Sequence, residues 1–381
     1  MRVLNVNSSI DLRAGGGGAE RTFQMSRSLA RQGVQCTVLT LNTDLDVGRV
    51  AALAPAVVVA LPSLWNRFHV PRLSWKIWKT IRRLVDEADI IHFMAHWSVL
   101  SAYVYLATRL AGKRYVVCPA GSLPLFGRSG WLKRLYNGVV GNAIIRNASG
   151  WIAVTAGEFS QFESYGIHRS RVTVIPNGVC EEDFPVTDTK AFLRVRSLPD
   201  APIILFMGRL NLIKGPDLLL QAFALLRGRL PEYHLVFAGP DAGMLPELQK
   251  TVEREQLTGR VHFLGYVGGA DKTATYRCAR LLVVPSRQEA MSIVALEAGF
   301  CGIPVLLTDQ CGFGDIRTVD PRLEVPATVL GIADGLVRLL GDQHALREVT
   351  PAWRDFVLRR YAWESIAPQY FALYRGILGL T

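Results

Sequence analysis

The sequence lacks the patterns that mark membrane-spanning, secreted and zinc-binding proteins. No stretch approaches the roughly 20 consecutive apolar residues that a transmembrane helix needs. The first residues, MRVLNVNSS, have no apolar core of the kind found in signal peptides. The six cysteines are scattered and form no C-x-x-C, which favours free thiols over a disulfide framework or a zinc site. We therefore expect a cytoplasmic protein.

Two glycine fingerprints for nucleotide phosphates are also absent. In G-x-G-x-x-G the third glycine would fall at Glu20 or Arg21, and no glycine stands directly before Lys and Ser or Thr as in Walker A. This disfavours a dinucleotide-dependent oxidoreductase. Four glycines do follow one another at Gly15–Gly18, between a β-like run and a helical pattern that ends at Gly33. Such backbone approaches a phosphate or sugar closely, which favours a ligand-binding loop over a merely flexible one.

Positive charge is concentrated in the first half of the chain. Residues 1–180 contain 21 Lys and Arg against 9 Asp and Glu, a net charge of +12, whereas residues 181–381 contain 22 against 23, a net of −1. A basic half predicts an acidic partner, such as anionic lipid, nucleic acid or a phosphorylated substrate. The alternative is basic surface that only aids solubility.

Two segments in this basic half, residues 64–84 and 123–146, interleave aromatic and basic side chains. Each alone is equally well explained as an amphipathic helix packed on its own domain. Because there are two of them, we expect peripheral association with an anionic membrane surface.

The 381 residues, half of them hydrophobic, are enough for two domains. Buried β-like runs alternate with helical patterns in both halves, which predicts an α/β protein with two doubly wound parallel sheets. The turn PNGV and the polar stretch after it mark a linker, so we place an N-terminal domain at 1–180 and a C-terminal domain at 181–361. Residues 362–381 form a last helix, which we expect to pack back on the first domain.

Polar residues follow several of the expected strands, where α/β sheets bind ligands. His92 and His96 lie at the end of the run DIIHFMAHWS, although a single histidine is more often structural. Arg209 and Lys214 lie five residues apart just after another strand, in GRLNLIKG. Two fixed cations there suit a diphosphate and would stabilise it as it leaves. The alternative is a solvated loop.

The stretch PSRQEAMSIVALEAGFCGIP follows a buried strand and predicts a helix bracketed by Glu289 and Glu297. Eight residues of helix separate the two carboxylates by about 12 Å. This is too far for a paired acid and base, and it suits two contacts with one extended ligand. A phosphate fits between them at the helix N-terminus.

The motifs GGGGAERT, VIPNGV, FMGRLNLIKG, LVFAGPD, VHFLGYVGGADK and PSRQEAMSIVALEAGFCGIPV occur in the order seen in one family. Over nearly its whole length the chain resembles the retaining glycosyltransferases of family 4. The resemblance implies the GT-B fold, two Rossmann-like domains facing a central cleft that holds a nucleotide sugar. It implies no metal and no cofactor besides the nucleotide-sugar substrate.

The resemblance also implies residue roles. Arg209 and Lys214 would hold the diphosphate, and Glu289 would contact the donor sugar near the reacting carbon. Glu297 would bind the ribose hydroxyls. The remaining donor-binding residues implied are Gly16, Gly17, Gly18, Met291, Ser292 and Ile293. His92 and His96 are candidates on the acceptor side.

The sequence departs from the family pattern at three places. Ala120 replaces a His or Arg that often precedes the glycine of PAG. Met94 replaces the second histidine of an HxH strand. Met291 and Ser292 replace an aromatic–glycine pair. Ala120 removes a polar group expected near the donor sugar, and His92 or His96 would have to substitute for it.

These observations predict a retaining, metal-independent hexosyltransferase. It would move a sugar from a nucleotide diphosphate to a hydroxyl of a glycan or lipid-linked acceptor in cell-surface polysaccharide synthesis, and it would not bind nucleic acid. Two alternatives stay open. One is a GT-B nucleotide-sugar epimerase, and the other is a non-catalytic nucleotide-sugar-binding protein, suggested by Ala120 and Met94.

Overall fold

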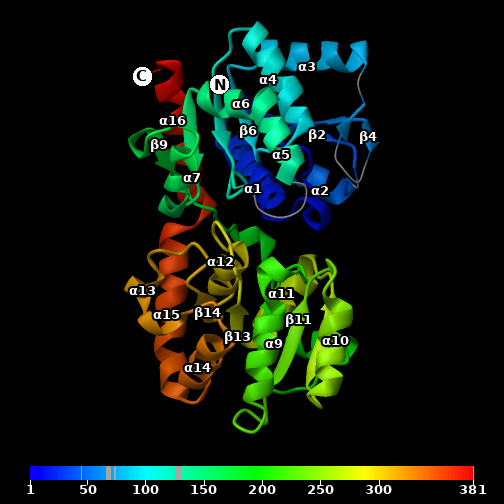
Figure 1. Cartoon of the computed structure of the whole chain (residues 1–381), viewed down its shortest axis with the longest axis vertical. Coiled ribbons are helices and arrows are strands. Elements are labelled where there is room, and N and C mark those ends of the chain that lie inside the picture. The colour runs from blue at the N-terminus through cyan, green and yellow to red at the C-terminus, as the bar shows by residue number, and fades with distance from the viewer. Residues whose placement is uncertain (44, 66–69, 73, 125–129, 381) are drawn as a thin grey trace. The chain divides into compact units, whose positions relative to one another are not determined.

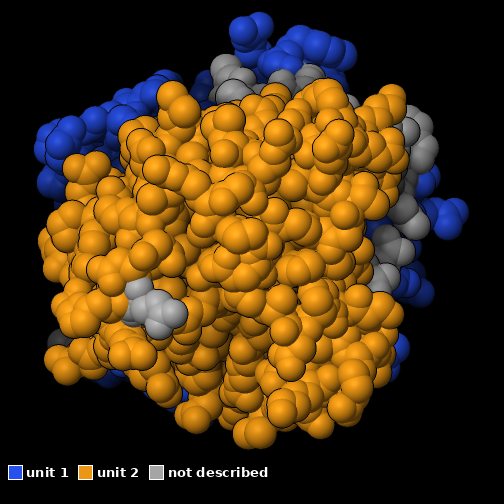
Figure 2. Space-filling model, turned by 90° about the horizontal axis from the view of Figure 1, so that it is seen from below, with its two compact units in different colours: residues 1–178, 363–381 blue, residues 179–362 orange. Residues whose placement is uncertain are grey.

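The computed structural model describes residues 1–43, 45–65, 70–72, 74–124 and 130–380. The chain divides into two compact units, residues 1–178 with 363–381 and residues 179–362 (Figure 2). The linker expected from the sequence, around residues 176–190, contains the first of these divisions. None of the described helices is long and apolar enough to cross a membrane.

Unit 1 is built on a parallel sheet of seven strands in the order β3-β2-β1-β6-β7-β8-β9 (Figure 1). Its strands are β1 (Arg2–Val6), β2 (Gln35–Leu41), β3 (Val57–Leu61), β6 (Ile90–Met94), β7 (Tyr115–Cys118), β8 (Gly150–Ala153) and β9 (Val172–Val174), with a small antiparallel pair β4 (Ser63–Trp65) and β5 (Val70–Pro71). Its helices are α1 (Leu12–Arg31), α2 (Val47–Ala51), α3 (Trp75–Glu87), α4 (Val99–Leu110), α5 (Gly130–Tyr136), α6 (Asn142–Arg146), α7 (Phe159–Glu163) and α16 (Trp363–Leu378).

Alternation along the strands sends successive side chains to opposite faces of this sheet. On one face, Leu4 and Phe93 pack in a core with Ile81 of α3 and Val104 of α4. On the other face lie α1 and α16, which pack against each other, and Asn5 donates to Ser26 of α1 at 2.9 Å. Strands buried on both faces read as continuous apolar runs, which is why their positions are recognisable in the sequence.

Unit 2 repeats this design with six parallel strands in the order β12-β11-β10-β13-β14-β15. Its strands are β10 (Ile203–Met207), β11 (His234–Ala238), β12 (Val261–Gly265), β13 (Ala279–Val284), β14 (Val305–Thr308) and β15 (Glu324–Val325). Its helices are α8 (Thr189–Val195), α9 (Pro216–Leu225), α10 (Leu245–Arg254), α11 (Gly269–Cys278), α12 (Ile293–Phe300), α13 (Ile316–Val319), α14 (Val329–Leu340) and α15 (Gln343–Arg360). Two parallel sheets with interposed helices confirm the predicted fold class.

The strand order of unit 2 reverses between β10 and β13. Strands β10, β11 and β12 run outward to one side, whereas β13, β14 and β15 run outward to the other. The connections that follow β10 and β13 therefore diverge, and in α/β sheets ligands bind at the carboxyl ends of the strands at such a point. This is where the two most distinctive loops of the sequence lie.

The prediction of a glycine loop before the first helix is wrong in part. Gly15–Gly18 lie within α1, whose helical geometry is broken at Gly16 (φ 55°, ψ −140°). Hydrogen bonds fix the backbone of these glycines. The Gly15 N–H donates to the Asp11 carbonyl, and the side chains of Asn7 and Thr22 both donate to the Gly18 carbonyl. Only Gly16 needs the left-handed backbone region that glycine adopts without strain.

Candidate functional site

Lys214 lies in the loop between β10 and α9, at the end of a 3₁₀ turn formed by Leu212–Lys214. The Asn211 side chain caps this turn by accepting the Lys214 backbone N–H at 3.0 Å, and Gly215 ends it in the left-handed region. The ammonium group donates to the Glu289 carboxylate at 2.5 Å. The two predicted site residues are thus brought together from different loops.

Glu289 lies in the loop between β13 and α12, not in the helix where the sequence placed it. The helix begins only at Ile293, because the preceding backbone bonds to other loops of unit 2. The Arg287 N–H donates to the Ile213 carbonyl and the Glu289 N–H to the Gln310 carbonyl. The predicted helix bracketed by Glu289 and Glu297 is therefore wrong, and the separation of about 12 Å derived from eight residues of helix does not apply.

The second oxygen of Glu289 is also occupied. Ser286 donates its hydroxyl to this oxygen at 3.0 Å, while Thr308 donates to the Ser286 carbonyl. The Glu289 side chain is 12% exposed and that of Lys214 is 26% exposed. A ligand that enters this site therefore meets a carboxylate in a fixed orientation, with a cation directly beside it.

Glu297 lies on α12 and is held by two side chains of α11. Lys272 donates its ammonium to one carboxylate oxygen at 2.9 Å, and Tyr276 donates its hydroxyl to the other at 2.6 Å. Tyr276 is fully buried, and burial with the neighbouring Glu297 charge raises its phenol pKa well above the ordinary value. Sequence reasoning missed both partners, since nothing in the chain marks a lysine 25 positions before a glutamate as its neighbour.

The remaining donor-side candidates flank these carboxylates. Arg209 follows β10 and is exposed, and its guanidinium has no ion-pair partner among the described residues. Met291 and Ser292 are buried at the start of α12, and Ile293 is its first residue. The Ser292 hydroxyl is buried without a hydrogen-bond partner in the described part of the chain, and it does not cap the helix. A helix N-terminus with a free hydroxyl beside it suits an anion.

In unit 1, Gly16, Gly17 and Gly18 are at least partly exposed on the first turns of α1, just past the end of β1. The hydrogen bonds that Gly15 and Gly18 make to Asp11, Asn7 and Thr22 hold this segment near the carboxyl end of β1. The backbone there is open to solvent, as contact with a ligand requires.

His92 lies in the core of unit 1. It is fully buried on β6, and its Nδ1 is 2.6 Å from the Tyr374 hydroxyl of α16. Burial lowers its pKa to about 3, and the Arg21 charge adds to this shift. A neutral ring packed beside Tyr370 and Tyr374 explains its presence without a ligand.

His96 is also buried, just past the end of β6. Its Nε2 is 2.8 Å from Oδ1 of Asn137, which opens a π-helix over Asn137–Gly141. Burial lowers the pKa of His96 to about 4, against the opposing effect of the Asn137 hydrogen bond. Nδ1 of His96 and Nε2 of His92 both lack a partner among the described atoms, so hydrogen bonding does not single out either ring for an acceptor-side contact.

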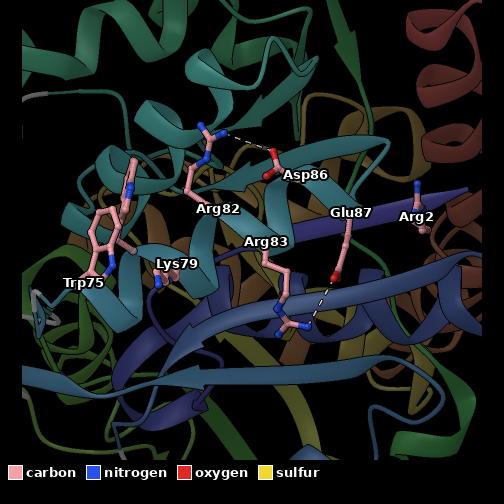
Figure 3. Close-up of a pocket in the computed structure, with 8 residues that line it drawn as sticks. Arg2, Trp75, Lys79, Arg82, Arg83, Asp86 and Glu87 are labelled. Atoms are coloured by element: carbon pink, nitrogen blue, oxygen red, sulfur yellow. Dashed lines mark ion pairs between the residues drawn. The ribbon is translucent and has the colours of Figure 1, made fainter.

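Two basic segments were expected at the surface, and both extend beyond the described residues, at 66–69 and 73 and at 125–129. Within the described part, α3 and Arg2 line an open groove of about 690 Å³ (Figure 3). Arg82 and Arg83 there pair with Asp86 and Glu87 one turn on, and Lys79 lies over the exposed Trp75 ring. On α5 and the π-helix after it, the exposed apolar side chains are Trp131, Leu132, Leu135 and Val139.

No group of three or more His, Cys, Asp or Glu side chains in the described ranges is arranged to hold a metal ion. The chain does contain one Asp-x-Asp spacing, at Asp44 and Asp46. Asp44 lies outside the described residues. The Asp46 carboxylate accepts the Arg49 backbone N–H at 2.6 Å and so caps α2.

Comparison with known proteins accounts for both halves of the chain. Residues 15–183 match the model of Glycosyltransferase Family 4, and residues 189–348 match that of Glycosyl transferases group 1. The D-inositol 3-phosphate glycosyltransferase of Nocardia farcinica is 34% identical over 385 residues, which cover 91% of this chain and 83% of that protein.

Solved structures show the same fold. The structure of Anabaena Alr3699/HepE in complex with UDP and glucose is similar with a TM-score of 0.80 and 18% identity, over 99% of this chain and 100% of that one. WaaG, a glycosyltransferase involved in lipopolysaccharide biosynthesis, is similar with a TM-score of 0.72 and 18% identity, over 98% and 100%. The predicted GT-B fold is confirmed.

Burial of neutral His92 predicts a specific pH dependence of stability. Its folded pKa of about 3 lies below the unfolded value of about 6.5, so the unfolded state binds the proton first. The contribution that neutral His92 makes to the free energy of unfolding is complete above pH 6.5, and it is lost as the pH falls towards 3. The His92→Gln variant should show a shallower loss of unfolding free energy below pH 6.5, by up to about 1.4 kcal/mol per pH unit.

Urea unfolding between pH 7.5 and pH 4.5 measures this slope. His344→Gln is the matched control, because the His344 side chain is 76% exposed. Equal slopes for His92→Gln and the wild type would contradict a neutral His92.

Proposed function

Because the chain belongs to the family 4 glycosyltransferases, we propose that it transfers a sugar from a nucleotide-diphosphate sugar to an acceptor hydroxyl with retention of configuration. The observation that carries the proposal is the Lys214–Glu289 pair at the carboxyl ends of β10 and β13, beside the N-terminus of α12. The similar HepE structure holds UDP and glucose, which supports a donor of this class.

The diphosphate of the donor would lie against Lys214 and Arg209. Both follow β10, and the ammonium and guanidinium groups together would offset the two charges that develop on the leaving diphosphate. The N-terminus of α12 adds backbone N–H donors and the unpartnered Ser292 hydroxyl. Together these groups would hold the diphosphate with protein donors alone, which is the basis for proposing metal-independent transfer.

The two carboxylates divide the sugars of the donor between them. Glu289 would accept hydrogen bonds from hydroxyls of the transferred hexose, and Glu297 would accept them from the ribose hydroxyls. Lys272 and Tyr276 already hold the Glu297 oxygens, so this carboxylate is oriented before the donor arrives. Preorganised acceptors reduce the entropy lost on binding.

Retention would follow from a front-face reaction in which the leaving phosphate oxygen takes the proton of the acceptor hydroxyl. The Glu289 oxygens are engaged by Lys214 and Ser286, which makes this carboxylate a weak nucleophile for a covalent intermediate. The C1–phosphate bond breaks as the C1–oxygen bond to the acceptor forms on the same face. The products are the glycoside and a nucleoside diphosphate that carries the proton.

The acceptor would be a lipid-linked glycan at an anionic membrane, in the synthesis of a cell-surface polysaccharide. The similarity to WaaG, a glycosyltransferase involved in lipopolysaccharide biosynthesis, supports this class. On α5, Trp131 and Leu135 are 66% and 57% exposed, beside Lys133 and Arg134. Exposed apolar side chains with basic neighbours suit the interface of an anionic bilayer.

The donor site predicts that Glu289→Ala and Lys214→Ala each lower kcat by at least about 10²-fold, because each removes a group that faces the reacting donor. A panel of UDP-, GDP- and ADP-sugars, tested with and without acceptor, gives the measurement. An altered sugar nucleotide formed from donor alone would instead identify an epimerase. The matched controls are Lys190→Ala and Glu247→Ala, which remove exposed charges of unit 2. Full activity in either site variant would refute these roles.

Metal-independent transfer predicts that activity persists in excess EDTA. Arg209 and Lys214 supply the positive charge that a divalent ion supplies in other transferases. When the ionic strength is held constant, so that screening of charges does not change, the initial rate should change by less than about twofold on addition of EDTA. Loss of activity that Mg²⁺ or Mn²⁺ restores would contradict the proposal.

Membrane association predicts binding to vesicles of phosphatidylcholine with phosphatidylglycerol, and weak binding to phosphatidylcholine alone. Trp131→Ser combined with Leu135→Ser should weaken binding by about 10-fold or more, since burial of each side chain contributes over 1 kcal/mol. Leu330→Ser is the control, because Leu330 of unit 2 is 69% exposed. The measurement is the fraction of protein that floats with the vesicles. An equal fraction for both lipid mixtures, or a fraction unchanged by the double substitution, would rule out the exposed face of α5 as the membrane-binding surface.

A further inference from the structure

Arg287 joins the two loops that carry Lys214 and Glu289. Its guanidinium donates to the Leu212 carbonyl at 2.7 Å and to the Asp217 carboxylate at 2.8 Å and 2.6 Å. Its backbone N–H donates to the Ile213 carbonyl at 2.7 Å. One residue thus bonds to the 3₁₀ turn that presents Lys214 and to the first turn of α9 behind it.

The charge of Arg287 is already matched within the protein. Asp217 accepts from both terminal nitrogens of the guanidinium, and this pairing raises the arginine pKa. Bidentate pairs of this kind fix direction as well as distance. A phosphate would have to compete with the Asp217 carboxylate for the same donors, so Arg287 differs in kind from Arg209, which has no such partner in the described chain.

The backbones of the two loops are also in direct contact. A Cβ atom added to Gly215 would lie 2.0 Å from the Pro285 carbonyl oxygen, and Gly215 has a positive φ of 67°. Glycine is therefore required here for close approach as well as for conformation. Besides this contact and the Lys214–Glu289 pair, the Arg287 side chain supplies hydrogen bonds that hold the two loops in a fixed position relative to each other.

We propose that Arg287, together with Asp217, is a positioning residue that holds the Lys214 ammonium at the diphosphate subsite. This inference rests on the proposed function. Lysine is a point charge on a flexible four-carbon stem, so its location depends on the backbone from which it starts. Without the Arg287 side chain, the bonds described above between the turn Leu212–Lys214 and the loop after β13 are reduced to the backbone bond at Ile213 and the Lys214–Glu289 pair. A shift of about 1 Å is enough to reduce catalysis by about 10²-fold.

The inference predicts a selective loss of diphosphate affinity. Calorimetry compares UDP, GDP and ADP with the corresponding monophosphates, using the nucleotide that the wild type binds. Arg287→Ala and Asp217→Asn should each weaken diphosphate binding by about 10-fold or more and monophosphate binding by less than about threefold. Arg287→Lys should rescue little, because an ammonium cannot form the bidentate pair.

A double-mutant cycle with Lys214→Ala separates positioning from general stability. If Arg287 acts through Lys214, adding Arg287→Ala to the Lys214→Ala variant should cause no further loss of diphosphate affinity. Arg359→Ala is the matched control, since it removes an exposed arginine that pairs with Asp355 on α15. Thermal unfolding confirms that each variant is folded.

The outcomes distinguish this role from the donor site itself. Additive losses in the double variant, or equal losses for diphosphate and monophosphate, would overturn the role of Arg287 and leave the proposed function standing. Failure of the wild type to bind any of the three diphosphates would refute the donor site, and the positioning role with it.

Discussion

The candidate site is organised around the ion pair between Lys214 and Glu289, which come from two different loops. Lys214 and Glu289 are mostly withdrawn from water, and each would carry an uncompensated charge without the other. The pair therefore has two effects at once. It adds to the Arg287 bonds that join the loops after β10 and β13. It also presents one cation and one carboxylate side by side to a ligand that, in the proposed function, is an anion attached to a sugar.

Unit 1 uses a buried arginine in a comparable way. Arg21 of α1 is 1% exposed and donates to Asn177, to the Ile175 carbonyl and to the Tyr370 hydroxyl. Asn177 lies one residue before Gly178, where the chain leaves unit 1, and Tyr370 lies after Trp363, where it returns. Three hydrogen bonds offset the desolvation of this charge, and they tie the glycine-containing helix to both of these segments.

The sequence predicted the fold class because buried parallel strands are continuous apolar runs, as in the stretches that became β6 and β13. It also predicted that Lys214 lies in a loop just after a strand, whereas it placed Glu289 at the start of a helix. It failed where tertiary bonds override local preference. The helix expected from Pro285 starts at Ile293, because Arg287 and Glu289 give their N–H groups to Ile213 and Gln310. The positions of Lys272 and Arg287 were unpredictable for the same reason, since their partners are distant in the chain.

The departure from the family at Ala120 has a consequence for the chemistry. Ala95 and Ala120 follow the neighbouring strands β6 and β7, and both have a positive φ, of 64° and 48°. Such backbone costs a non-glycine residue about 1 kcal/mol or more, and it persists only where neighbours hold it. Glu158 does so by accepting the N–H groups of Gly121 and Val154, which leaves its carboxylate committed to backbone. Ala120 itself has no side chain that could take a proton. This agrees with the proposal that a phosphate oxygen of the donor deprotonates the acceptor.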